Sequence, residues 1–116
     1  MDPIVYEKVD RRELGLRGEV ELSKKVFRKI PKVRVACVGD STTYGYGIEN
    51  LPTDAYPHQL EKLLGPSYSV QNFGKNAATL LKKGDLPYWE QIEYKQALKS
   101  KPDIVIINLG VNDAKP

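Results

Sequence analysis

Short apolar segments alternate with amphipathic ones between residues 33 and 116. Three apolar segments are rich in the β-branched and aromatic side chains that favour strands, and they occupy residues 33–38, 68–73 and 104–109. The third segment, Ile-Val-Ile-Ile-Asn-Leu, is almost continuously apolar, as a strand covered on both faces requires. The pattern therefore predicts three buried strands.

Two helices are predicted in the segments that connect these strands. The first covers residues 55–64 and ends at Gly65-Pro66, and the second runs from about residue 88 to residue 99. One face of the first helix carries four apolar side chains, namely Tyr56, Leu60, Leu63 and Leu64. Strands that alternate with helices through short links require right-handed crossovers and a parallel sheet, so an α/β domain is predicted.

Each predicted strand ends in a polar turn that contains glycine. The turns are Gly39-Asp40-Ser41, Asn72-Phe73-Gly74 and Gly110-Val111-Asn112-Asp113. Because the strands are parallel, all three turns emerge at one edge of the sheet, where ligands bind in such folds. Any one of these turns is ordinary by itself, and their convergence is what predicts a site.

The chemistry available to these turns is acyl transfer. Ser41 is the candidate nucleophile that attacks an ester carbonyl. The backbone N–H of Gly74 and the side-chain amide of Asn112 are candidate donors to the oxyanion that forms, and the backbone N–H of Ser41 is a third. A Gly-x-Ser-x-Gly elbow is absent, because Thr42 and Thr43 follow the serine.

The three blocks resemble those of the SGNH hydrolases, the GDSL-type esterases and acylhydrolases, over about residues 33–116. Ser41 matches the nucleophile block, Gly74 the second block and Asn112 the third, and the sequence is most similar to carbohydrate O-acetylesterases, including sialate O-acetylesterase-like proteins. The resemblance implies a flavodoxin-like three-layer α/β/α sandwich, truncated here after its third strand. It implies a small-molecule or carbohydrate ester as substrate, and we expect no cofactor and no metal.

The sequence departs from the family pattern at several positions. Ala77 lies near a position where the family often has glycine, and Val111 stands where threonine or a similar small polar residue is common. The general base of the family is a histidine in a C-terminal Asp-x-x-His block. The only histidine here, His58, lies on the first predicted helix with no Asp three residues before it, and we expect it to face solvent. We therefore interpret residues 33–116 as the N-terminal half of a hydrolase domain that lacks its base and is inactive alone.

Two other functions remain open at this point. One is a non-catalytic remnant of the fold that binds carbohydrate or acetate. The other is phosphate or nucleotide binding at the first glycine-rich turn, which lacks both Gly-x-Gly-x-x-Gly and a Lys-Ser/Thr pair. Tyr44 and Tyr46 either form a stacking wall for a sugar ring or pack over the sheet. Asp40 and Asp113 are expected to order their turns. Trp89 either packs in the core or at the start of its helix, which we expect, or lines a substrate cleft.

Charge distinguishes residues 1–32 from the rest of the chain, and the sequence lacks the patterns of nucleic-acid-binding and membrane-spanning proteins. The net charge of +3 arises in residues 1–32, which hold nine Lys/Arg and six Asp/Glu and are predicted to be a basic leader or connector. Within them, residues 19–22 alternate weakly as an edge strand would. Neither a nucleic-acid motif, a membrane-spanning run nor a signal peptide is found, so the protein is expected in the cytoplasm, or secreted if its N-terminus is incomplete. The single cysteine, Cys37, is predicted to lie in the core, and the oligomeric state is left open.

Overall fold

The computed structural model describes residues 4–8 and 27–114, in two compact units, Met1–Lys32 and Val33–Pro116. In the first unit, β1 (Ile4–Lys8) pairs antiparallel with β2 (Phe27–Pro31). The weak strand expected at residues 19–22 lies outside the described residues. All candidate site residues belong to the second unit.

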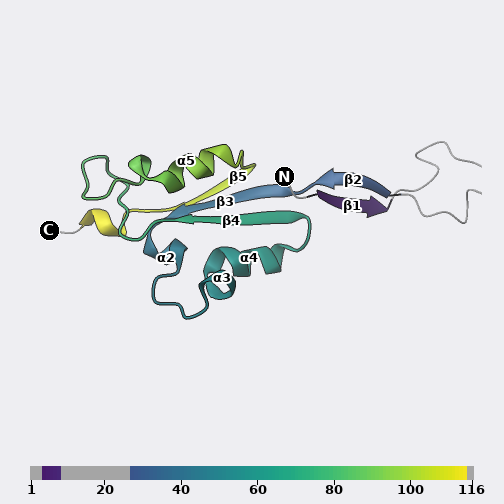
Figure 1. Cartoon of the computed structure of the whole chain (residues 1–116), viewed down its shortest axis with the longest axis horizontal. Coiled ribbons are helices and arrows are strands. Elements are labelled where there is room, and N and C mark those ends of the chain that lie inside the picture. Colours follow the sequence, from purple (N-terminus) through teal and green to yellow (C-terminus); the bar gives the residue numbers. More distant parts are fainter. Residues whose placement is uncertain (1–3, 9–26, 115–116) are drawn as a thin grey trace, which may run out of the picture. The chain divides into compact units, whose positions relative to one another are not determined.

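The second unit contains a parallel sheet of three strands in the order β4-β3-β5 (Figure 1). They are β3 (Val33–Gly39), β4 (Tyr68–Gly74) and β5 (Ile104–Asn108). At the carboxyl edge, Gly39 stands opposite both Gly74 and Asn108. This register confirms the predicted parallel sheet and brings the three strand ends to the same level.

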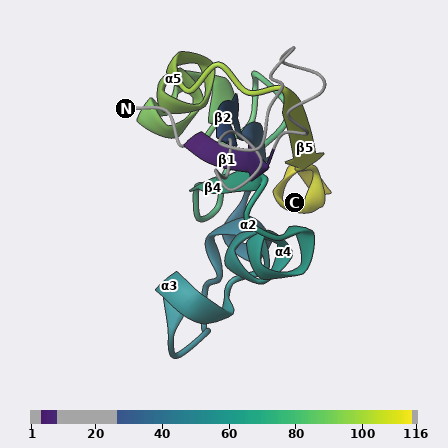
Figure 2. The ribbon, with the colours of Figure 1, turned by 90° about the vertical axis from the view of Figure 1, so that its right-hand side faces the viewer.

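Helices cover both faces of this sheet. The helical segments are α2 (Ser41–Tyr44), α3 (Leu51–Asp54), α4 (Tyr56–Leu64), η2 (Tyr88–Glu90), α5 (Ile92–Lys99) and η3 (Val111–Ala114). Figure 1 shows α5 on one side of the strands and α2, α3 and α4 on the other, and Figure 2 shows the same separation from a second direction. The arrangement is the three-layer α/β/α architecture that the family resemblance implied.

The helix predicted from residue 88 to residue 99 is interrupted. Gln91 adopts an extended conformation between η2 and α5, with φ −88° and ψ 154°. The side chain of Tyr88, which is fully buried, donates a hydrogen bond to the Phe73 carbonyl at 2.6 Å, and its ring meets those of Trp89 and Tyr94 edge-on. We attribute the break to this aromatic packing, which fixes the first turn apart from the rest, and Trp89 packs at the helix start as expected.

The core lies around β3, the central strand. Val35, Ala36, Cys37 and Val38 are each at most 5% exposed. A cluster on the α5 face is formed by Val38, Ala78, Tyr88 and Ala97. The buried position predicted for Cys37 is therefore confirmed. None of the helices within the described part of the chain has the length and apolar character needed to cross a membrane.

Two burial predictions were wrong. β5 was expected to be covered on both faces, but Ile104, Val105 and Ile107 are 46%, 49% and 57% exposed. Among the described strands β5 is an outer one, with a single neighbour, β3. Leu63 was placed on the packed face of α4 and is 85% exposed, because the last turn of α4 lies beside the beginning of β4, at the end of the sheet.

Candidate active site

Ser41 is the first residue of α2 and follows the central strand directly. The preceding residue, Asp40, is 2% exposed and caps the helix, because its Oδ1 accepts the Thr42 N–H at 3.1 Å. Asp40 therefore orders its own turn, as expected. Within the described residues, the Ser41 hydroxyl makes no hydrogen bond, so none of them activates it as a base would.

Two glycines allow α2 to pack directly on the ends of the strands. A Cβ added to Gly39 would lie 2.0 Å from Thr43 Oγ1, and one added to Gly74 would lie 2.3 Å from the Tyr44 nitrogen. Both separations are far below van der Waals contact, so only glycine fits at either position. These close approaches fix the helix that begins with Ser41 against β3 and β4.

The Gly74 N–H, a predicted oxyanion donor, has a partner within its own turn. It donates to Asn72 Oδ1 at 2.8 Å, while Asn72 Nδ2 donates to the Thr43 carbonyl at 2.8 Å. Asn72 thus links β4 to α2, a role that the sequence reasoning missed. The signal was an Asn two residues before a glycine N–H, the spacing of an Asx turn. For Gly74 to stabilise an oxyanion, the anion must replace the Asn72 oxygen.

The turn at residues 110–113 is hydrogen-bonded to the loop that follows Gly74. Asn112 Nδ2 donates to the Ala78 carbonyl at 3.0 Å and keeps a second N–H. The two carboxylate oxygens of Asp113 accept the N–H groups of Leu80 at 2.8 Å and Leu81 at 2.6 Å. Asp113 is therefore structural, as expected. These hydrogen bonds connect the turn at residues 110–113 with the loop at residues 78–81, after Gly74. The sequence did not predict this connection.

Beneath α2, the side chains of Thr43, Cys37 and Tyr56 form a buried group. Thr43 and Cys37 are fully buried. Burial, with the Cys37 thiol beside it, raises the pKa of Tyr56 to about 12. Burial also raises the pKa of the Cys37 thiol, an effect that the neighbouring Tyr56 hydroxyl reduces. Both groups stay protonated at neutral pH, and Cys37 is not a reactive thiolate.

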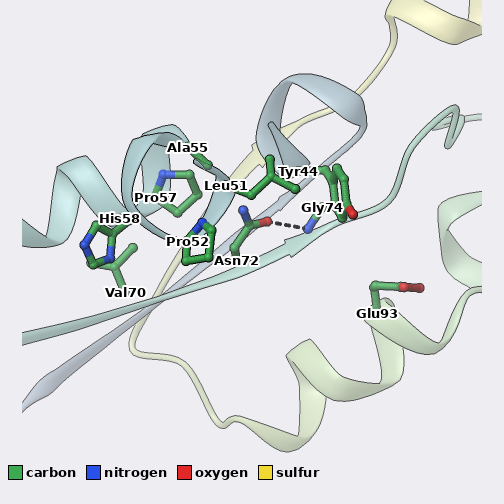
Figure 3. Close-up of a pocket in the computed structure, with 10 residues that line it drawn as sticks. All are labelled: Tyr44, Leu51, Pro52, Ala55, Pro57, His58, Val70, Asn72, Gly74 and Glu93. Atoms are coloured by element: carbon green, nitrogen blue, oxygen red, sulfur yellow. Dashed lines mark hydrogen bonds between the residues drawn. The ribbon is translucent and has the colours of Figure 1, made fainter. Parts of the chain in front are cut away.

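His58 is less exposed than expected. It is half-buried and lines a cavity of about 450 Å³ together with Tyr44 and Gly74 (Figure 3). The expectation was wrong because the helix wheel places a residue only relative to the apolar face, whereas here α4 meets the free edge of β4. Ser41 does not line this cavity, and nor does Tyr46, which is 76% exposed. Of the two tyrosines considered for a sugar-stacking wall, Tyr44 lines this cavity.

The described residues contain no group of three or more His, Cys, Asp or Glu side chains that could hold a metal ion. What they place at the carboxyl edge of the sheet is a serine hydroxyl, backbone N–H groups and a carboxamide. Such an arrangement suits acyl transfer, in which a hydroxyl attacks and fixed donors stabilise the oxyanion.

Comparison with known proteins identifies the family. The sequence model of the GDSL-like lipase/acylhydrolase family matches residues 37–116. An acetylxylan esterase from Xylanibacter ruminicola is 51% identical over 84 residues, which cover 72% of this chain and 18% of that protein. A solved structure of a mutant of the esterase AlinE4 matches with a TM-score of 0.54 and 30% identity, over 71% of this chain and 42% of that one. The chain thus spans less than half the length of either relative. These matches confirm the resemblance carried by the three blocks, and the chain belongs to the GDSL-like lipase/acylhydrolase family.

Proposed function

We propose that residues 33–116 are the N-terminal half of the hydrolase domain of a serine esterase that removes O-acetyl groups from carbohydrate. The observation that carries the proposal is the position of Ser41, at the start of a helix fixed by Gly39 and Gly74 at the carboxyl end of the central strand. Membership of the family supports ester hydrolysis. The similarity to an acetylxylan esterase supports an acetylated sugar as substrate.

In the proposed reaction, Ser41 Oγ attacks the carbonyl carbon of the acetyl ester and loses its proton to a general base. The oxyanion that forms is stabilised by the Ser41 N–H, by the second Nδ2 hydrogen of Asn112, and by the Gly74 N–H once the anion replaces Asn72 Oδ1. The C–O bond to the sugar then breaks, and the protonated base returns its proton to the sugar oxygen. Water hydrolyses the acetyl–serine ester with the same base. Each oxyanion donor in such a site is worth on the order of 10²–10³ in rate.

The general base is the component that we place outside these 116 residues. His58, the only histidine, lines a cavity to which Ser41 does not contribute. Losing the catalytic histidine of a serine hydrolase can cost about 10⁶ in turnover, so we expect little or no activity from residues 1–116 alone. Robust hydrolysis of p-nitrophenyl acetate by the pure chain, abolished by Ser41→Ala, would refute this part of the proposal.

The role of Ser41 itself is tested by chemical rescue. Imidazole is added as an external base, and acetate release from acetylated xylo-oligosaccharides is compared for the unmodified chain, Ser41→Ala and the matched control Ser67→Ala, which alters an exposed serine far from α2 in sequence. We expect imidazole-dependent release by the unmodified chain and the control, and none above background by Ser41→Ala. Equal release by all three proteins, or none by any, contradicts the proposal.

A second candidate is a non-catalytic module that binds carbohydrate. Two observations favour it: none of the described residues is a base beside Ser41, and the Gly74 N–H is engaged by Asn72. The two candidates differ in covalent chemistry. Labelling of Ser41 by a fluorophosphonate probe supports the esterase, whereas sugar binding that survives Ser41→Ala without such labelling supports the binding module.

A further inference from the structure

The cavity beside Tyr44 is a site to which neither the family blocks nor the proposed reaction assigns a role. It lies along the edge of β4 that faces away from β3, and its volume of about 450 Å³ falls within the range of ligand sites, roughly 300–1,000 Å³. Figure 3 shows that His58 reaches it from α4 on one side of β4 and Glu93 from α5 on the other. The cavity therefore spans the sheet edge.

The backbone of β4 at this edge is protected against another strand. The Val70 N–H donates to Glu61 Oε2 at 2.8 Å and the Gly74 N–H to Asn72 Oδ1 at 2.8 Å. Because N–H groups alternate in direction along a strand, that of Asn72, between them, points to the same edge. With two of these three donors engaged by side chains, a peptide that added here as a further strand would have to displace both side chains. A small molecule therefore suits this edge better than a further strand.

Polar groups in the cavity lack partners in the described part of the chain. Glu93 Oε1 is shielded from solvent and has no hydrogen bond there, and the His58 ring has none either. Asn72 Nδ2 uses one hydrogen for the Thr43 carbonyl and keeps the other. Glu93, Asn72 and His58 all line the cavity, so its polar lining consists of a carboxylate, a carboxamide and an imidazole.

The remaining lining narrows the class of ligand. The ring of Tyr44 and the side chains of Leu51 and Pro52 give the cavity apolar walls. The Glu93 carboxylate disfavours anions, and the described residues provide no cluster of ligands for a metal ion. A neutral sugar fits this lining, because its hydroxyl groups can hydrogen-bond to the polar atoms and its C–H faces can cover the apolar walls.

We propose that this cavity binds a sugar unit of the substrate, as a subsite next to the unit that carries the ester. This inference rests on the proposed function for the choice of substrate. Tyr44, which lines the cavity, and Ser41 are the two ends of α2, whose four residues place their Cα atoms about 5 Å apart along the axis. Gly74 belongs both to the cavity and to the candidate oxyanion hole. A sugar in the cavity would hold the neighbouring ester at the end of β3.

The test measures binding of xylotriose, a neutral sugar without an ester, to the full chain carrying Ser41→Ala. Backbone amide NMR shifts report the site, and we expect a Kd of about 1 mM with the largest shifts at Asn72 and Gly74. Glu93→Gln replaces one acceptor oxygen and the negative charge by an N–H donor group at nearly the same size, and His58→Phe removes both ring nitrogens, so each should weaken binding about tenfold. Glu90→Gln, which neutralises an exposed carboxylate of η2, is the matched control and should leave the affinity unchanged.

The results separate this inference from the proposed function. No shifts at the cavity amides with excess xylotriose, or equal affinity for all variants, overturns the sugar site. The imidazole rescue tests Ser41 independently of the cavity. If imidazole restores activity but xylotriose does not bind, the esterase proposal holds and the sugar subsite is refuted. If xylotriose binds but imidazole does not restore activity, the subsite holds and the esterase proposal is refuted. Amide spectra of each variant that match the parent show that a loss of affinity is not a loss of fold.

Discussion

Replacing Ala77 by glycine should stabilise the protein. Ala77 has φ 65°, in the left-handed region, and is exposed in the loop that follows Gly74. An L-residue in that region costs about 1–2 kcal/mol, which glycine avoids. Glycine loses more conformational freedom on folding, which costs roughly 0.5–1 kcal/mol. The free energy of unfolding should therefore rise by about 0.5–1 kcal/mol, and little packing is lost because the methyl group is exposed.

Urea unfolding, followed by circular dichroism, measures this change. For a urea m-value of about 1–3 kcal/mol/M, the midpoint should rise by a few tenths of a molar, roughly 0.3–0.5 M, with the slope unchanged. The matched control is Ala78→Gly. Ala78 is fully buried and does not have a positive φ, so the same substitution there should lower the midpoint. A lower midpoint for Ala77→Gly, or a rise of equal size for Ala78→Gly, would refute the reasoning.

Three further predictions concern the site and its support. Gly74→Ala places a Cβ 2.3 Å from the Tyr44 nitrogen and should destabilise the fold by about 1–3 kcal/mol in urea unfolding; an unchanged midpoint contradicts the packing described. Asp113→Ala removes the acceptor of the Leu80 and Leu81 N–H groups, whose hydrogen exchange should become faster than in the parent chain while that of β3 does not change. Tyr56 has a folded pKa of about 12 against an ordinary 10, so its contribution is complete below pH 10 and is lost as pH rises through 12. Over that window the parent should lose more stability than Tyr56→Phe, and parallel losses in urea titrations would contradict the shift.

Local sequence patterns were sufficient to predict the strands and the positions of the turns. Apolar runs that end in glycine-containing turns are local signals, and parallel order follows from the helices between them. The exposure of β5 and of Leu63 could not be predicted this way, because each depends on whether a neighbouring element lies over the residue. A sequence pattern shows that a side chain is apolar but does not show where the sheet ends.

The candidate site divides in the same way. Ser41, Gly74 and Asn112 were found as types of residue at strand ends, and their catalytic roles stay predictions. The link from Asn72 to the Thr43 carbonyl joins residues 29 positions apart, so no local pattern shows it. Ala77 is the opposite case. Its departure from the family glycine was visible in the sequence, and the structure gives the departure a physical meaning, since its backbone has a positive φ.

The two outer strands of the sheet, β4 and β5, differ in how many of their outward-facing backbone groups remain available to a further strand. On the β4 side, Glu61 and Asn72 occupy the N–H groups of Val70 and Gly74, so a further strand on this side would have to displace both side chains. On the β5 side, Ile104, Val105 and Ile107 remain exposed beside backbone groups that no described strand pairs. Among the described residues, a further strand would meet occupied N–H groups on the β4 side and unpaired backbone groups on the β5 side. Both neighbours of β3 lie within the first 108 residues, so the strands that frame the turn carrying Ser41 require no residue after Asn108.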